Sequence, residues 1–317
     1  MQEKLQPTVA IENEFVPGLM HVNFGGYHIR DIEFVAAFEI NTKKIGLDIS
    51  EAIYADPNCA APIIGNEKLP KFGYEVMAGP ISDGCAPHMK EPFHCYDPKE
   101  IQPVDVAEVL RSVKADILIN YLPVGSYEGS RIYAQAALDA GVAFINCIPE
   151  FIASDDVWAK KFEDAGLPIA GDDIKSQVGA TIVHRVLADL LIRRGVKIEH
   201  TYQLNIGGNT DFLNMTEEDR LKTKRISKTE AVTSQVPYEI PVRIGPSDFV
   251  EFLGDKKICY IYIKGKKFGD QPLYLTVKLS VEDSPNSAGV VIDVIRAVKL
   301  ALDRKIAGRL ISISAYA

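Results

Sequence analysis

The chain has few cysteines, no excess of positive charge and no long hydrophobic run. Its five cysteines are too few and too scattered over 317 residues for a disulfide framework, so a reducing cytoplasm is the simplest expected setting. No apolar run approaches the roughly 20 residues that span a bilayer. The N-terminus also lacks the basic start and apolar core of a signal peptide. We therefore expect a cytoplasmic protein that is neither exported nor inserted in a membrane.

The charge balance is acidic, with a formal net charge of −8 and no basic block or basic amphipathic stretch. Nucleic acids and anionic membranes bind clustered lysine and arginine, so neither is an expected partner. Apolar residues make up 47% of the chain and charged residues 25%, which is typical of a globular protein. Because the chain is longer than one ordinary domain, we expect two cores, or one core with an inserted domain.

The first 180 residues alternate strand-like apolar runs with helical patterns. Residues 34–40 and 117–122 are predicted strands, and helices are predicted over about 128–140 and 155–165. Strands that are apolar on both faces and joined by helices are typical of a parallel sheet covered on both sides. Ligands of such a sheet bind at the carboxyl ends of its strands. The sequence therefore predicts an α/β fold.

The pattern changes near residue 196. Apolar and polar residues then alternate through a predicted strand that buries one face, with its apolar side made by Leu273, Leu275, Val277, Leu279 and Val281. Residues 258–264 are its predicted hairpin partner. Residues 196–283 thus predict a mixed or antiparallel sheet with one intervening helix, and a final helix is predicted from about Ser284 to Arg304.

Two connecting segments of the first region carry candidate binding residues. NYLPVGS places Gly125 and Ser126 before a helix, where backbone amides can meet an anion. A strand-to-helix turn also needs glycine for geometric reasons alone, and this reading is favoured. GDDIKSQVG places Asp172 and Asp173 between a strand and a helix. Either aspartate can contact a ligand or cap the helix, and the residues alone leave both readings open.

Two further segments lie in the second region. NIGGNTDFLN holds Asn205, Asn209 and Asp211, which can bind sugar hydroxyls but are also ordinary turn residues. Lys224 and Lys228 are four residues apart and share a helix face. Paired lysines usually form a solvated face, because lysine is seldom buried. The alternative is that both ammonium groups converge on a phosphate or a developing oxyanion.

One cluster of metal-ligand types also occurs, consisting of Cys85, His88, His94 and Cys95. Its spacing, C-x2-H-x5-H-C, fits no established zinc pattern, so we expect no metal there. His184 lies in the middle of a predicted helix and is expected to be structural. No other ligand set in the sequence requires a metal.

Eight segments in unbroken order between Val16 and Tyr316 together resemble the myo-inositol-1-phosphate synthase family in its shorter bacterial and archaeal form. They are VPGLMHVNFGGYHIRDIEFVAAFEI, NYLPVGS, NCIPEFIASD, GDDIKSQVGAT, NIGGNTDFLN, KRISKTEAVTS, IGPSDF and EDSPNSAGVVIDVIR. The resemblance implies a Rossmann-like NAD domain interrupted by an α+β catalytic and tetramerisation domain. The expected bounds are 1–180 and 286–317 for the NAD domain and 181–285 for the inserted one. A cytoplasmic homotetramer is implied as well.

The reaction implied by the resemblance converts glucose 6-phosphate to 1D-myo-inositol 3-phosphate with NAD. The family oxidises C5, which acidifies C6; the resulting enolate attacks the C1 aldehyde, and the hydride is then returned. Negative charge develops on oxygen beside a phosphate throughout, so fixed cations and amide donors suit the path. A divalent or monovalent cation could assist, although no ligand set demands one.

Three sets of site residues are implied by matching motifs. The catalytic set is Lys224, Lys228, Lys257, Asp211, Asp173 and Asp283. The substrate-binding set is Asn205, Asn209 and Lys256, where Lys256 and Lys257 of GDKK are ambiguous by one residue. The cofactor-binding set is Glu39, Leu122, Pro123, Gly125, Ser126, Asp172, Ser284, Asn286 and Ser287. Glu39 stands where the family often has an aspartate for the adenosine ribose.

Two departures from the family pattern accompany the match. The family begins with a strand and a glycine-rich loop for the NAD pyrophosphate, which MQEKLQPTVAIENE does not supply, and it continues past the SAY motif to a further lysine. The missing central strand would expose the edges of its neighbours. The alternatives are an NAD(P)-dependent dehydrogenase of homoserine-dehydrogenase-like plan, which would accumulate NADH, and an inactive oligomerising fragment.

Overall fold

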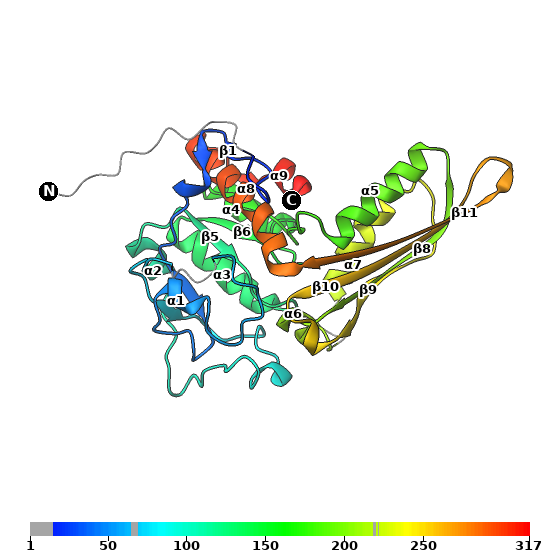
Figure 1. Cartoon of the computed structure of the whole chain (residues 1–317). Coiled ribbons are helices and arrows are strands. Elements are labelled where there is room, and N and C mark those ends of the chain that lie inside the picture. The colour runs from blue at the N-terminus through cyan, green and yellow to red at the C-terminus, as the bar shows by residue number, and fades with distance from the viewer. Residues whose placement is uncertain (1–14, 65–68, 218–219, 221) are drawn as a thin grey trace.

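The protein contains a parallel sheet region and a separate four-stranded sheet, which lie at opposite ends of the molecule in Figure 1. The computed structural model describes residues 15–64, 69–217, 220 and 222–317. Over these residues no helix is both long and apolar enough to cross a bilayer. The domain bounds expected from the sequence stay a prediction.

The parallel region consists of two pieces. One is a four-stranded sheet in the order β12-β7-β6-β5, built from β5 (Ile117–Asn120), β6 (Ala143–Asn146), β7 (Pro168–Ala170) and β12 (Gly308–Arg309). The other is a two-stranded parallel pair, β3 (Ala37–Glu39) and β4 (Val76–Ala78). The four strands of the larger sheet are paired in parallel throughout.

Helices cover both faces of the larger parallel sheet. One face packs against α2 (Val106–Ser112), α3 (Tyr127–Ala140) and α4 (Asp156–Asp164), with Phe144 and Phe162 stacked and fully buried. The other face packs against α8 (Asp283–Asp303) through Val290, Val294 and Val298, which recur every four residues on one side of the helix. The predicted α/β fold with a sheet covered on both sides is therefore confirmed.

Strands β3 and β5 each keep one unpaired edge within the described part of the chain, because β3 pairs with β4 and β5 with β6. A doubly wound sheet normally has a central strand between two such strands. Here a cavity of about 1230 Å³ lies against residues of both strands. The expectation that these neighbouring edges would be exposed agrees with this arrangement.

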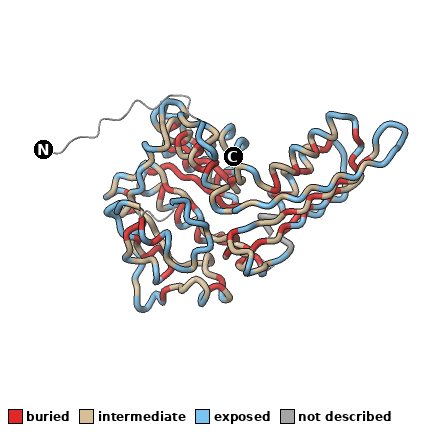
Figure 2. The backbone as a smooth tube through the Cα atoms, viewed as in Figure 1, coloured by how far each residue is buried: buried red, intermediate tan, exposed pale blue. Residues whose placement is uncertain are grey.

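The second sheet is mixed and has the order β11-β10-β8-β9. Its strands are β8 (Lys197–Gly207), β9 (Val242–Phe249), β10 (Lys256–Lys266) and β11 (Pro272–Glu282). Strands β10 and β11 form the expected antiparallel hairpin, β10 is antiparallel to β8, and β8 is parallel to β9. Exposure alternates along the long strands, as Figure 2 shows.

One face of this sheet packs on α5 (Ala180–Arg193) and α7 (Lys222–Thr233), which bury Ala188 and Val232 against Ile261 and Ile263 of β10. The prediction of one helix inside this region is wrong, because the short α6 (Thr210–Asn214) precedes α7. Asn209 caps α6 by accepting a hydrogen bond from the amide of Phe212.

The N-terminal hairpin of β1 (Asn23–Phe24) and β2 (Tyr27–His28) is fixed to α8 by a buried ion pair. Arg296 and Asp293 on α8 are paired and almost fully buried. The guanidinium also donates to the carbonyls of His21 and Val22, at 2.7 and 3.0 Å, and the His21 ring lies 2.5 Å from Asp293. One ion pair thus organises the chain around residues 21–28.

We expect Asp293→Ala to lower the midpoint of thermal unfolding by about 5 °C or more, because it leaves the Arg296 charge buried without its carboxylate. Asp189→Ala on α5 is the matched control, since Asp189 pairs with Arg193 at the surface and should shift the midpoint by less than about 2 °C. Differential scanning fluorimetry of both variants would measure this. Equal shifts would contradict the anchoring role of Asp293.

Candidate active site

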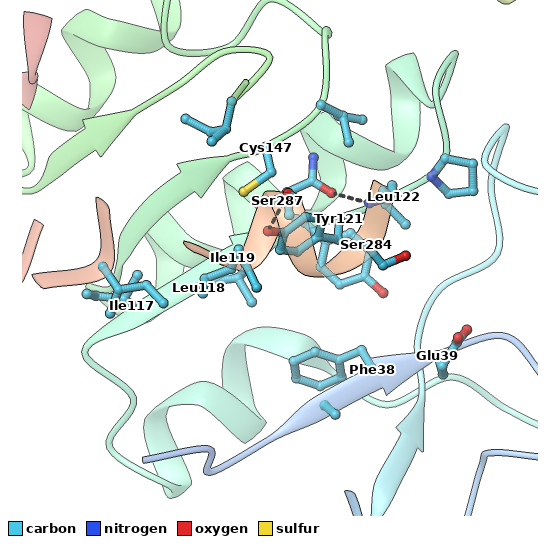
Figure 3. Close-up of a pocket in the computed structure, with 18 of the residues that line it drawn as sticks. Phe38, Glu39, Ile117, Leu118, Ile119, Tyr121, Leu122, Cys147, Ser284 and Ser287 are labelled. Atoms are coloured by element: carbon cyan, nitrogen blue, oxygen red, sulfur yellow. Dashed lines mark hydrogen bonds between the residues drawn. The ribbon is translucent and has the colours of Figure 1, made fainter. Parts of the chain in front are cut away.

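The 1230 Å³ cavity brings together residues from both sheets. Figure 3 shows Phe38 and Glu39 of β3 facing β5 and the residues after it, with Ser284 and Ser287 of α8 nearby. The sequence-predicted residues that line the cavity are Glu39, Leu122, Pro123, Asp173, Asn209, Asp211, Lys228, Lys257, Asp283, Ser284 and Ser287. Residues up to 248 positions apart in the chain thus meet at the carboxyl end of the parallel strands.

The cationic end of the cavity is built around Lys257. Its ammonium nitrogen lies 3.1 and 3.3 Å from the two carboxylate oxygens of Asp283, and both side chains are mostly buried. The Asn209 amide lies 3.4 Å from the same carboxylate. Lys228, from α7, is also buried and lines the cavity. Two lysines are therefore withdrawn from water at one site, which contradicts a solvated face for Lys228.

Two residues that the sequence analysis did not single out complete this end. Lys175 lines the cavity and forms an ion pair with Asp173, whose backbone is left-handed with a φ of 56°. Asp255 is buried and accepts hydrogen bonds from the Ser284 amide at 3.0 Å and its hydroxyl at 2.8 Å. Asp255 thereby fixes the start of α8 beside Asp283. In the sequence, both residues stand within or beside segments that were already candidates: Lys175 follows the aspartates of GDD, and Asp255 is the aspartate of GDKK.

The other end of the cavity has a carboxylate and apolar walls. Glu39 ends β3, accepts a hydrogen bond from the Ile40 amide at 2.7 Å and pairs with Lys44 at 3.2 Å. The Tyr121 hydroxyl, missed from the sequence, lies 3.5 Å from that of Ser287. Burial raises the pKa of the nearby Cys147 thiol to about 12, so this thiol is not a nucleophile at neutral pH.

The start of α3 does not offer free amides to an anion. The Asp83 carboxylate accepts hydrogen bonds from the amides of Glu128 and Gly129 at 2.8 and 2.9 Å, and Glu150 accepts one from Gly125 at 3.3 Å. Ser126 is fully buried. This arrangement favours the geometric reading of Gly125 and Ser126 over the anion-binding alternative, because protein carboxylates already occupy the positive end of the helix.

Asp172 and Asn286 are placed as structural residues, away from the cavity lining. The Asp172 carboxylate accepts hydrogen bonds from the amides of residues 152–154 and so orders the loop before α4. It does not cap the following helix, because the N-cap of α5 is Gly179. The Asn286 side chain pairs with both the amide and the carbonyl of Val178. Their expected contacts with the cofactor are not supported by this placement.

Lys256 is exposed and paired in register with Glu282 of β11, whereas its neighbour Lys257 faces the cavity. Successive side chains of a strand point to opposite faces, so only one of the two can reach the site, and the geometry favours Lys257. Asn205 is fully buried within the second sheet and does not line the cavity. The side chain of Lys224 lies outside the described residues, although its backbone belongs to α7.

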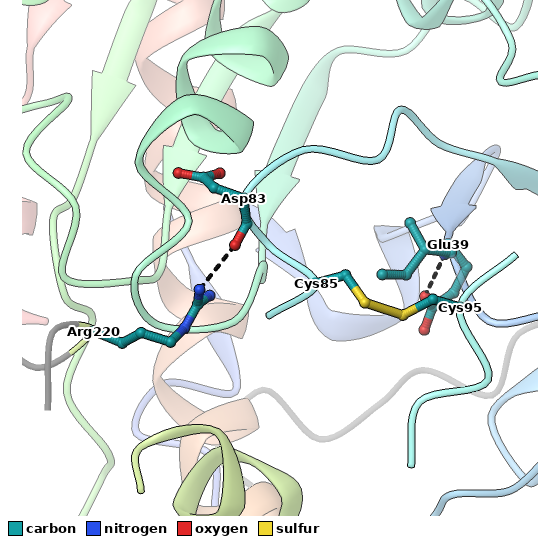
Figure 4. The surroundings of a disulfide bond; sticks show 6 residues. Glu39, Asp83, Cys85, Cys95 and Arg220 are labelled. Atoms are coloured by element: carbon teal, nitrogen blue, oxygen red, sulfur yellow. Dashed lines mark hydrogen bonds between the residues drawn. A yellow bond between two sulfur atoms is a disulfide. The ribbon is translucent and has the colours of Figure 1, made fainter. Parts of the chain in front are cut away.

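The cluster of cysteine and histidine residues is not a metal site. Cys85 and Cys95 are joined by a disulfide bond, shown in Figure 4, so neither thiolate is available to a metal. Among the described residues, no group of three or more His, Cys, Asp and Glu side chains is arranged to hold a metal ion. The sequence predicted no disulfide framework and did not indicate this single bond, which requires only two cysteines that meet in space.

The comparisons with known proteins agree with this arrangement. A family model described as myo-inositol-1-phosphate synthase matches residues 179–284. The inositol-3-phosphate synthase of Mycolicibacterium smegmatis is 54% identical over 314 residues, covering 97% of this chain and 85% of that protein. That of Corynebacterium glutamicum is 52% identical over 312 residues, covering 96% of this chain and 84% of its own length.

Solved structures show the same fold. The crystal structure of Ari2 has 36% sequence identity and a TM-score of 0.74, covering 92% of this chain and 79% of the other. A myo-inositol-1-phosphate synthase-related protein from Thermotoga maritima has 24% identity and a TM-score of 0.72, covering 91% of this chain and 80% of the other. The latter likeness concerns the fold alone.

A buried chain of polar side chains runs from His184 of α5 to Asn205 of β8. The His184 ring contacts Thr201 at 2.7 Å and Gln203 at 3.2 Å, Gln203 donates to Asn205 at 3.2 Å, and Asn205 donates to the Gly245 carbonyl at 2.7 Å. The hydroxyl of Thr201 donates to another backbone carbonyl. The Thr201 oxygen and the Gln203 oxygen both act as acceptors toward the two ring nitrogens. A neutral imidazole carries only one N–H, so it can donate to only one of them. Burial nevertheless lowers the pKa of His184 to about 4, so the ring is neutral at pH 7.

We expect His184 to make the fold acid-sensitive. Its pKa lies below the unfolded value of 6.5, so its contribution to the unfolding free energy is complete above pH 6.5 and falls by roughly 3 kcal/mol as the pH approaches 4. Thermal unfolding of wild type and His184→Gln at several pH values between 7.5 and 4 would show a shallower pH dependence in the variant. His200→Gln, on the opposite face of β8, is the control and should retain the wild-type slope; an unchanged slope in His184→Gln would refute the assignment.

Proposed function

The chain belongs to the inositol-3-phosphate synthase family, and on that premise we propose that it converts D-glucose 6-phosphate to 1D-myo-inositol 3-phosphate with NAD as its cofactor. The observation that carries this proposal is the single cavity in which the carboxylate Glu39 and the buried lysines Lys228 and Lys257 meet. Such a cavity can hold a dinucleotide along the strand ends and a phosphorylated sugar beside the cations.

The cavity fits NAD at two points. Glu39 stands at the carboxyl end of β3, where a carboxylate can accept hydrogen bonds from ribose hydroxyls. Leu122 and Tyr121 provide apolar surface beside α8 for the nicotinamide end. The amides of Gly125 and Glu128 are already bonded to carboxylates, so this turn does not offer them to the pyrophosphate. When bound, NAD would accept a hydride from the sugar and return it.

The lysines would supply the fixed positive charge that the reaction needs. Lys257 is held by both carboxylate oxygens of Asp283, so its remaining N–H donors have a defined direction toward the cavity. Lys228, from α7, is buried and lines the same cavity. Lys224, four residues earlier in this helix, stays a catalytic residue predicted from the sequence alone. Ammonium groups in a site shielded from water stabilise a developing enolate and the substrate phosphate.

Carboxylates and amides would then orient these groups. Asp173 holds Lys175, and Asn209 bridges toward Asp255 and Asp283 while capping α6. Asn209 and Asp211 lie where they can bind the sugar hydroxyls. The positions of these donors are set before substrate binds, which reduces the reorganisation required during reaction.

Incubation of the purified chain with glucose 6-phosphate and NAD would test the proposal. We expect inositol phosphate by phosphorus NMR without net NADH absorbance, and we expect Lys228→Ala and Lys257→Ala each to lower kcat/KM by about 100-fold or more. Lys160→Ala, an exposed lysine on α4, is the matched control and should stay within about twofold. Accumulation of NADH would indicate a dehydrogenase instead, and no turnover by wild type would refute the activity of this chain.

We also propose that the chain forms a homotetramer through the uncovered face of the second sheet. Opposite the face covered by α5 and α7, the rings of His200, Tyr262 and Tyr202 stack in sequence, with centroids 6.0 and 5.0 Å apart. Leu204 and Tyr274 are exposed on the same face.

No helix of the described chain packs on this face. Lys278 lies over the Tyr260 ring, so charged groups are interspersed among the aromatic ones. Exposed aromatic groups are typical of an interface, and a second copy related by a two-fold axis would present the same groups.

We expect Leu204→Glu to shift the protein to smaller species, because a carboxylate would be buried between sheets without a partner. Val157→Glu introduces the same charge at another exposed apolar position, on α4, and should leave the assembly unchanged. Analytical ultracentrifugation of both variants and wild type would measure the masses. A wild-type monomer, or a Leu204→Glu tetramer, would exclude this face as the interface.

A further inference from the structure

The disulfide between Cys85 and Cys95 lies at the wall of the cavity and has no role in the proposed reaction. Figure 4 shows it between Glu39 on one side and the Asp83–Arg220 contact on the other. Both cysteines are half-buried, so a small thiol can reach the bond. The effect of reducing the bond depends on the two segments that Cys85 and Cys95 connect.

The Cys85 end supports the loop before α3. Two residues earlier, Asp83 caps the first amides of α3 with its carboxylate, and its carbonyl accepts a hydrogen bond from Arg220 at 2.9 Å. Gly84 lies against Ser126, because a β-carbon on Gly84 would be only 3.2 Å from the Ser126 hydroxyl oxygen. The residues beside Cys85 thus hold the turn that ends in Ser126.

The Cys95 end supports the strand that carries Glu39. Cys95 forms an isolated β-bridge with Asn41, and the amide of Tyr96 donates to the carbonyl of Ile40 at 2.9 Å. The amide of Thr42 donates to the carbonyl of His94 at 3.0 Å. The residues around Cys95 are therefore bonded directly to those that follow Glu39.

The disulfide is a covalent connection between two walls of the same cavity. The segment from 86 to 94 contains one short 3-10 helix, Pro87–Met89, and few backbone hydrogen bonds to other elements. Ala86 and Met89 are buried and hold the middle of this segment, and the cross-link restrains the irregular backbone at its two ends. Loss of the bond would release Asp83 and the residues after Glu39 to move independently.

The remaining cysteines distinguish this bond from general oxidation. Cys59, Cys147 and Cys259 are free thiols. Burial raises the pKa of Cys147 to about 12 and that of Cys259 to about 11, which keeps both as unreactive thiols. Cys59 is an exposed free thiol, and only Cys85 and Cys95 of the five cysteines carry a disulfide that a reductant can open.

We propose that Cys85 and Cys95 form a reversible redox site that controls the order of residues 79–97 and the start of α3, and through them the affinity of the cavity for its dinucleotide. The affinity part rests on the proposed use of NAD. In the exchange, a dithiol attacks one sulfur as a thiolate to give a mixed disulfide, and its second thiol displaces the protein thiol. Two electrons pass to the protein disulfide, which becomes two thiols, and the dithiol becomes a cyclic disulfide.

The test compares oxidised wild type, wild type reduced with dithiothreitol, and the Cys85→Ser/Cys95→Ser double variant. We expect reduction to raise the Kd for NAD on the order of tenfold and to speed amide hydrogen exchange in residues 79–97 and 127–130. Reoxidation with diamide should reverse both changes in wild type. The double variant should resemble the reduced protein and ignore dithiothreitol, while Cys59→Ser, which removes the exposed thiol, should respond like wild type.

Two results would overturn the proposal. One is equal NAD affinity and equal exchange in oxidised and reduced wild type, and the other is a dithiothreitol response that persists in the double variant. If NAD binds in neither state, the proposed function fails, and the exchange of residues 79–97 alone then decides whether the bond orders the cavity wall. Thermal unfolding of each sample would separate a local loosening from loss of the whole fold.

Discussion

Arg220 provides the contact on which the arrangement of the cavity depends, because it connects the region of α6 and α7 to two loops of the parallel sheet. Its guanidinium donates to the Val124 carbonyl at 3.0 Å and to that of Asp83 at 2.9 Å. Asn214 donates to the same Val124 carbonyl at 2.9 Å. Gly125 permits this approach, since a β-carbon there would lie 2.8 Å from that of Arg220. These contacts join the second sheet region to the parallel region along one wall of the cavity.

The cavity holds lysines among carboxylates, in a chain whose net charge is −8. Lys175 and Lys257 reach it because each is paired with an aspartate, Asp173 and Asp283, which offsets part of the cost of removing an ammonium group from water. Aspartates also cap helices. Asp83 matters most for the cavity, because its carboxylate accepts hydrogen bonds from the first amides of α3. A carboxylate at that helix end shifts any anion site toward the lysines.

The agreement between sequence and structure is closest where local patterns decide the outcome. The β10–β11 hairpin and helices α3 and α8 follow from period-two and period-four spacing. Site residues were predicted correctly as lining the cavity where a motif places them at the end of a strand, as with Glu39 and Lys257. The choice of Lys257 over Lys256 needed the pleat of β10, which an ambiguous alignment cannot supply.

The sequence by itself determined the family, the α/β class and the residue types available to the site, because these depend on local spacing and on motifs in order. Only the tertiary structure decided that Asp83 occupies the start of α3, that Asp255 holds α8, and that Cys85 meets Cys95. Such contacts join residues far apart in the chain or in irregular loops, where no periodicity constrains the partner. Their physical basis is the pairing of buried charges and amides, which depends on what the completed fold brings within reach.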